Sequence, residues 1–257
     1  MILSHRAALN GVELDSVDNR ILIQGIEEAA GKEQISAVSL FGGVGQRITN
    51  RHRDSLDVTI RFSIHIKKGD MQARSDVFEK VNAWAAGGGW LTVNYKEDRR
   101  LRVICAQYPA AGDMWKWTNI YSIVFRAYAV PYWQDATPKK LMASGGSMNK
   151  IFGVGGSVRT VLDVEFKCTS GTCTSFKVSA GGSAIELAGL NLTSGQTLAI
   201  THTDDGLLRI TAGGQSVLGK RTAASSDDLF VMPGSVNVSI ITQGAGTLTI
   251  SCAGRYA

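Results

Sequence analysis

The chain has 257 residues, 44% of them hydrophobic and 19% charged, which is enough apolar material for a folded core and unlike a disordered composition. No apolar run approaches the ~18 residues that cross a bilayer, and the N-terminal residues lack the apolar core of a secretory signal, so we expect cytoplasmic synthesis and no membrane insertion. The net charge of +5 is spread thinly, with 17 Lys and Arg against 15 Asp and Glu in residues 1–138 and 10 against 7 in residues 139–257, which disfavours a nucleic-acid-binding surface.

The first 138 residues combine alternating β patterns with one helical pattern. Asp70 is a candidate N-cap, the apolar residues after it recur at helical spacing, and Gly87–Gly89 follow as a stop signal. The expected elements are strands at Ile21–Gly25 and Val58–Lys67, a helix from Met71 to about Ala86, and strands at Trp90–Tyr95, Leu101–Tyr108 and Trp115–Val130. The pattern predicts a mainly β domain, a sandwich or split barrel carrying one α-helix.

A basic cluster precedes the second of these strands. Arg51 and Arg53 belong to it, and Asp54 and Asp57 follow at once. This mixture of charges indicates a solvated loop or a subunit contact rather than a phosphate-binding surface.

The composition changes near residue 140. All five Trp and five of the six Tyr precede that point, whereas the rest of the chain is rich in Gly, Ser, Thr and Val. A polar, glycine-containing stretch lies between the two parts and is typical of a linker. We therefore predict a first domain at 1–138, a linker at 139–156 and a second domain at 157–257.

The second domain contains short β patterns separated by turn residues. Its turn at Thr203–Gly206 is a hairpin signal. The expected strands are Val158–Lys167, Ser175–Ser179, Ala184–Leu187, Gln196–Thr203, Gly206–Ala212, Ser235–Thr242 and Gly246–Cys252. Regular spacing of this kind predicts an all-β sandwich.

The four cysteines leave three interpretations open. Cys168 and Cys173 flank a short polar turn and could form a disulfide in an oxidising medium. A zinc site that adds Cys252 and His202 is the second interpretation, although these two residues lack paired ligand spacing. We favour the third, small buried thiols, and expect no metal site.

No catalytic motif is present in the sequence. Gly42–Gly45 resembles a phosphate loop but lacks the Gly-Lys-Ser/Thr that would follow, so we expect a loop between strands. His202 could be grouped with Asp204, Asp205 and Arg209, but turn geometry already explains residues at a tight hairpin. We expect no enzymatic activity, no catalytic residue and no cofactor.

Two tryptophans are candidates for contacts with other chains. Trp115 and Trp117 are two residues apart, so in a strand both rings lie on one face. They are either core residues or a subunit contact. Together with Arg51 and Arg53 they are our tentative contact residues.

The order of elements supports a resemblance to a known family. The strand at Ile21–Gly25, the glycine loop, the strand at Val58–Lys67, the helix and the following strands lead to Pro131-Tyr132-Trp133. Over residues 1–135 this resembles the N-terminal belt domain of siphophage distal tail proteins (Dit). In that family a galectin-like or carbohydrate-module-like sandwich often follows, and the second domain is similar in type and position.

The resemblance implies a structural virion protein rather than an enzyme. Such proteins are expected to form hexameric rings that join the tail tube to the baseplate or tail tip, with DNA passing through the lumen. The implied partners are further copies of the chain, the tail tube protein, the tape measure protein and a tail-tip or baseplate protein. The implied location is the phage tail tip, after assembly in the host cytoplasm.

Three other functions remain at this stage. A hydrolase on a β-sandwich would need clustered carboxylates, which the residue spacing does not show. A carbohydrate-binding module for host-surface glycans would suit a β-sandwich, although the second domain lacks the Trp residues on which sugars usually stack. A tail-tube-like protein would share the first domain but would not need the second.

Overall fold

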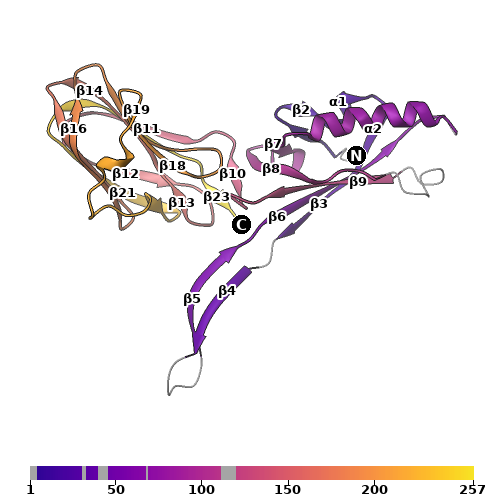
Figure 1. Ribbon diagram of the computed structural model, residues 1–257, viewed down its shortest axis with the longest axis horizontal. Helices are drawn as coiled ribbons and strands as arrows, with labels where there is room; N and C mark the ends of the chain where they lie inside the picture. Colours follow the sequence, from indigo (N-terminus) through magenta and orange to yellow (C-terminus); the bar gives the residue numbers. More distant parts are fainter. Residues whose placement is uncertain (1–4, 31–32, 40–45, 68, 111–119) are drawn as a thin grey trace. The chain divides into compact units, whose positions relative to one another are not determined.

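The computed structural model describes residues 5–30, 33–39, 46–67, 69–110 and 120–257. The chain divides into two compact units, Met1–Tyr132 and Trp133–Ala257, which we call the first and second units. Both are mainly β, as predicted (Figure 1).

The first unit is built around one antiparallel sheet whose strands differ in length. Its elements are β1 (Ala7–Leu9), β2 (Val12–Glu13), α1 (Leu14–Val17), β3 (Ile21–Ala30), β4 (Glu33–Ser39), β5 (Gln46–Arg53), β6 (Leu56–Ile64), α2 (Met71–Ala85), β7 (Gly89–Val93), the 3₁₀ turn η1 (Asn94–Lys96), β8 (Arg99–Gln107) and β9 (Ile120–Ala127). The strand order is β2-β1-β7-β8-β9-β6-β3, whereas β4 and β5 pair with each other in a separate two-stranded sheet. Strands are found at four of the predicted places, and β9 (Ile120–Ala127) covers part of the predicted strand Trp115–Val130, whose residues 115–119 lie outside the described residues. Helix α1 has four residues and was not predicted.

Helix α2 begins and ends where its sequence signals lie. The Asp70 carboxylate accepts a hydrogen bond from the Ala73 amide at 2.9 Å, which satisfies one of the free donors of the first turn. Gly87 follows the last turn with a φ of +80°, a conformation that glycine adopts without strain. One face of α2 packs on β9, where Phe78 meets the Tyr121 ring edge-on at a centroid distance of 4.8 Å.

The second unit is a sandwich of two sheets. Its elements are β10 (Trp133–Asp135), β11 (Lys139–Gly145), β12 (Met148–Val154), β13 (Thr160–Val161), β14 (Asp163–Ser170), β15 (Cys173–Ala180), β16 (Ser183–Leu192), β17 (Thr197–His202), β18 (Leu208–Ala212), β19 (Gln215–Ser216), the 3₁₀ turn η2 (Leu218–Lys220), β20 (Phe230–Val231), β21 (Gly234–Thr242), β22 (Ala245–Cys252) and β23 (Arg255–Tyr256). One sheet has the order β11-β22-β14-β17-β18-β19 and the other β12-β21-β15-β16.

The core of the sandwich lies between these two sheets. Along the strands, buried apolar residues alternate with more exposed polar ones, as in β22, where Leu248 and Ile250 are buried. The rings of Phe166 in β14 and Phe176 in β15 pack against each other at a centroid distance of 5.4 Å and an angle of 41°, so the two inner faces interdigitate.

Two predictions about connecting segments need correction. The segment 139–156, expected to be a linker, contains β11 and β12, which are edge strands of the two sheets. Its glycine, serine and lysine residues resemble a linker because an edge strand has few buried positions. Arg51 and Arg53, expected in a loop, lie in β5.

Candidate assembly surfaces

The strands β4 and β5 form a ribbon that continues the β3–β6 pair. The pairing runs from Ala30 with Leu56 to Glu33 with Arg53, so the same two chain segments stay side by side from the sheet into the ribbon. Figure 1 shows the β4–β5 pair extending beyond the end of β3 and β6. An isolated two-stranded hairpin is marginally stable in water, so this ribbon is a segment that a protein contact would stabilise.

The ribbon exposes apolar side chains. Ile35, Val38 and Ile48 are 54%, 57% and 59% exposed. Ala37 pairs with Ile48, which gives one face two neighbouring apolar positions. Exposed β-branched side chains on an uncovered strand pair are typical of a surface that another chain covers.

The sheet of the first unit also has exposed apolar residues on the face away from its core. Leu22 lies between the buried Ile21 and Ile23, and it is 49% exposed. Ile104 pairs with Arg126, whose guanidinium makes two hydrogen bonds of 2.5 Å to the carboxylate of Asp57. This charge-assisted pair raises the pKa of Arg126, and the face therefore combines apolar side chains with internally neutralised charges.

The structure describes two of the four tentative contact residues, Arg51 and Arg53. The Arg53 guanidinium lies 5.1 Å from the centroid of the Tyr132 ring, a cation–π contact within the first unit. Arg51 pairs with Ile35 in the ribbon. Trp115 and Trp117 lie outside the described residues, as does Gly42–Gly45. The structure places Arg51 and Arg53 on the ribbon, and their contact with another chain stays a prediction.

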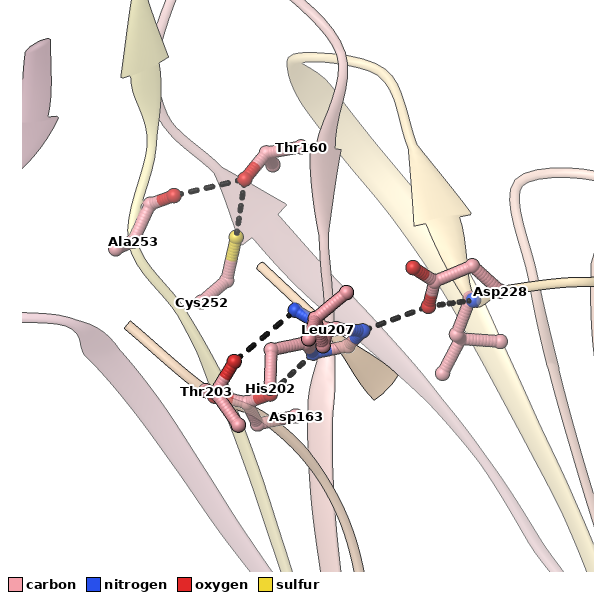
Figure 2. Close-up of polar contacts among 9 residues, drawn as sticks. Thr160, Asp163, His202, Thr203, Leu207, Asp228, Cys252 and Ala253 are labelled. Carbon is pink, nitrogen blue, oxygen red and sulfur yellow. Dashed lines mark hydrogen bonds and ion pairs between the residues drawn. The ribbon is translucent and has the colours of Figure 1, made fainter. Parts of the chain in front are cut away.

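His202, the one histidine of the second unit, lies between two carboxylates (Figure 2). Its Nδ1 is 2.7 Å from Oδ1 of Asp163, and its Nε2 is 2.6 Å from Oδ1 of Asp228. Both ring nitrogens therefore donate, which requires the charged imidazolium. Asp228 also accepts a hydrogen bond of 2.7 Å from the Leu229 amide.

The carboxylates determine the charge of His202. Burial alone would lower the pKa of His202, but the hydrogen bonds to Asp163 and Asp228 outweigh burial and raise it to about 9. Burial would likewise raise the pKa of Asp228, but the bond with His202 lowers it. A histidine charged at neutral pH with both nitrogens occupied lacks the free lone pair that a general base needs.

The grouping of His202 with Asp204, Asp205 and Arg209 is therefore not the one in the structure. Those residues belong to the β17–β18 hairpin, where the Gly206 amide donates to the Thr203 carbonyl at 2.8 Å, as the turn signal predicted. The actual partners come from β14 and from the segment before β20, far away in sequence.

The cysteines are thiols in this structure. Cys168, Cys173 and Cys252 are buried and Cys105 is half-buried, and all four are free. Cys168 lies near the end of β14 in the six-stranded sheet, and Cys173 is the first residue of β15 in the four-stranded sheet. The short turn between the two strands therefore crosses from one sheet of the sandwich to the other. Within the described ranges, no three His, Cys, Asp or Glu side chains are grouped as they would be around a metal ion. Neither helix among the described residues could span a membrane.

The two units together define a class of fold, a helix-bearing β unit followed by a two-sheet β-sandwich. The crystal structure of the SPP1 Dit (gp 19.1) protein, described as a paradigm of the hub adsorption apparatus in phages that infect Gram-positive bacteria, has this fold. It aligns with 98% of this chain and 99% of its own, with a TM-score of 0.68 and 12% identity. The chain therefore has the fold of a phage distal tail protein over nearly its whole length.

Two structures of the phage p2 baseplate in its activated conformation align more loosely. The structure with strontium gives a TM-score of 0.45 at 8% identity and covers 96% of this chain and 97% of that one. The structure with calcium gives 0.49 at 8% identity and covers 99% and 98%. No protein-family model and no curated protein sequence matches this chain.

Proposed function

We propose that the protein is a structural component of a phage tail, a distal tail hub that joins the tail tube to the baseplate or tail tip. The observation that carries this proposal is the full-length agreement with the SPP1 Dit fold, which covers 98% of this chain and therefore both of its units. The chemistry of the second unit agrees with a non-enzymatic role, because His202 is held as a charged structural group.

The first unit, within residues 1–138, forms the ring of this hub, and the second unit, which includes 157–257, is the sandwich attached to it. The ribbon supports ring formation because its exposed Ile35 and Ile48 need a covering surface. A ribbon on one copy that covers a different surface on the next makes a head-to-tail contact, and such contacts form a ring when the rotation between successive copies closes. We expect six copies, as the family resemblance implies.

The partners and location follow from this role. The ring contacts the tail tube protein, the tape measure protein and a tail-tip or baseplate protein, and DNA passes through its lumen. Assembly takes place in the host cytoplasm, and the assembled protein resides in the virion. A host-surface glycan is a further candidate partner of the second unit.

The test is the solution mass of the full chain by light scattering, with negative-stain images of the same fraction. A ring of six chains has a mass of about 165 kDa, six times 27.5 kDa. The double variant Ile35→Asp/Ile48→Asp should reduce the mass to that of a single chain, because charges at the covered face oppose its burial. The matched control is Ile151→Asp, an equally drastic change at an exposed position of β12 in the second unit.

Two results would contradict the proposal. The first is a wild-type protein that stays at 27.5 kDa when mixed with extracts of the phage's tail proteins and instead binds a glycan array. The second is a ring whose mass is reduced by Ile151→Asp and not by the ribbon variant.

A further inference from the structure

The turn between β1 and β2 contains the one Asn-Gly sequence of the chain, Asn10-Gly11. Leu9 pairs with Val12 across it, so these two residues make the whole connection. Asn10 has a φ of +53° and Gly11 a φ of +82°, the combination that a type I′ hairpin turn requires. Asn-Gly is a preferred sequence for such a turn, so the fold accounts for its presence here.

The same dipeptide carries a reaction that the turn does not need, because asparagine is thermolabile and a following glycine has no Cβ to hinder attack on its side chain. The Gly11 nitrogen bonds to Cγ of Asn10 and passes its proton to Nδ2, the bond between Cγ and Nδ2 breaks, and ammonia leaves. Water then opens the resulting five-membered ring. Opening at the side-chain carbonyl gives aspartate, and opening at the main-chain carbonyl gives isoaspartate. Both residues are exposed, so water reaches the site.

The folded turn opposes this ring closure. The ring brings Cβ of Asn10 and the Gly11 nitrogen to the same side of the bond between Cα and the carbonyl carbon of Asn10. A φ of +53° belongs to the left-handed region, in which ψ lies between about +30° and +60°. At such ψ values Cβ and the next nitrogen lie on nearly opposite sides of that bond. The turn must therefore leave its conformation before the ring forms.

The Asn10 carboxamide is also held by backbone groups at the start of β7. Its Oδ1 accepts a hydrogen bond of 2.9 Å from the Trp90 amide, and its Nδ2 donates one of 3.1 Å to the Gly88 carbonyl. We call these two bonds the clamp. A Cβ at Gly89 would lie 2.0 Å from Oδ1, so the carboxamide occupies the space that this glycine leaves open. Loss of Nδ2 as ammonia removes the donor to Gly88, so the reaction destroys the clamp.

Neither product restores the clamp. Aspartate at position 10 has only acceptor oxygens to present to the Gly88 carbonyl when it is ionised. Isoaspartate adds one carbon to the main chain, which a two-residue turn between the paired Leu9 and Val12 does not accommodate. Either product therefore weakens the attachment of the β1–β2 hairpin to the sheet.

A second contact holds the other side of the hairpin. The indole Nε1 of Trp84 in α2 donates a hydrogen bond of 2.9 Å to the Val12 carbonyl. None of residues 10–13 is buried, so hydrogen bonds rather than apolar burial keep this part of the hairpin in place. In such segments the strength of a few hydrogen bonds determines how well the native conformation is maintained.

We infer that Asn10 is a site of spontaneous deamidation, and that the clamp and the left-handed turn protect it in the folded first unit. The rate of modification is then set by the local stability of the β1–β2 hairpin. This inference rests on the first unit alone and is independent of the proposed tail function.

The test follows Asn10 in the full chain by mass spectrometry of the tryptic peptide 7–20 after incubation at pH 8, with fragment ions to separate Asn10 from Asn19. A synthetic peptide of the same residues is the unprotected reference. Two variants weaken the hairpin and leave Asn10-Gly11 intact. Gly89→Ala displaces the carboxamide, and Trp84→Phe removes the bond to Val12.

Gly87→Ala is the matched control, because its φ is also positive and a Cβ there meets nothing within 4 Å. Near-UV circular dichroism shows whether each variant keeps its fold. If Gly89→Ala is unfolded, Trp84→Phe alone decides the test.

The wild-type chain should convert at least about tenfold more slowly than the peptide, with aspartate and isoaspartate as the products. Gly89→Ala should convert at least about tenfold faster than the wild type and Trp84→Phe at least about threefold faster, whereas the control should stay within about twofold. Equal rates in the wild-type chain and the peptide would overturn the proposed protection. A wild-type rate in the deciding variants would overturn the role of the clamp, and earlier conversion of another asparagine would overturn the site.

Discussion

Lys80 of α2 donates a hydrogen bond of 2.9 Å to Asp18, which lies 62 residues earlier, just before β3. The same carboxylate accepts two bonds from the Arg20 guanidinium, at 2.7 Å and 2.8 Å. Asp18 therefore ties the start of the sheet to the helix, and its side chain is nearly inaccessible to solvent.

Asp18→Asn should destabilise the first unit by about 2 kcal/mol, the usual size for a lost bond between charged groups. The hydrogen bonds from Arg20 outweigh burial and hold the pKa of Asp18 well below its usual value. A lowered pKa in the folded state means that this stabilisation is present above the unfolded pKa of 3.8 and is lost as the pH falls below it. Urea unfolding of both proteins at pH 7 and pH 3 checks this, and an equal difference at the two pH values would contradict it.

Gly89→Ala should be among the most damaging single substitutions in the first unit. A Cβ at position 89 would lie 2.0 Å from Oδ1 of Asn10, whose carboxamide accepts from the Trp90 amide and donates to the Gly88 carbonyl. We expect a loss of about 3 kcal/mol from the clash and the lost bonds. Gly87→Ala is the control, because its φ is also positive but nothing lies within 4 Å of its Cβ, so about 1 kcal/mol of backbone strain remains.

Loss of the proton from His202 should make the second unit less stable at high pH. Its pKa is raised from 6.5 to about 9, so its contribution is complete below pH 6.5 and is lost as the pH rises through 9. The groups that face it are Asp163 and Asp228, with Arg255 near the latter. Thermal unfolding at pH 6 and pH 10 should show a difference of about 2 kcal/mol between wild type and His202→Gln at pH 6 and little at pH 10. A difference that grows with pH would contradict this assignment.

Thiol labelling should distinguish free cysteines from a disulfide. Three of the four thiols are buried, and burial raises the pKa of Cys252 to about 11. Burial also raises the pKa of the half-buried Cys105, so we expect at most one slowly reacting thiol per native chain at pH 8. Four should react after unfolding in denaturant. Two reacting thiols in the unfolded chain would instead indicate a Cys168–Cys173 disulfide.

The sequence predicted strands well where one face of the strand is buried. Residues Val58–Ile64 alternate because Val58, Ile60 and Phe62 face the core, and the helix at Met71 has both its cap and its stop signal. The ribbon was not predicted because the described side chains of β4, at 34–38, are all exposed, and Glu33–Ser39 therefore lacks the alternation that marks a strand.

The partners of His202, which lie far from it in the sequence, could not be predicted either. Asp163 and Asp228 lie 39 and 26 residues from His202, and only the pairing of β14 with β17 brings the first of them close. The hairpin carboxylates Asp204 and Asp205 were the nearer candidates in sequence. Local spacing offered only hairpin residues that the turn already explains, so the two carboxylate partners of His202 were not predicted.

The first and last strands of the second unit are neighbours, since Trp133 of β10 pairs with Tyr256 of β23. Asp135 reinforces this closure by accepting bonds of 2.8 Å from both the Gly254 amide and the Tyr256 hydroxyl. Because the two ends of the second unit meet, its closure is made within that unit alone, and a change at Asp135 would loosen the first and the last strand of the sandwich together.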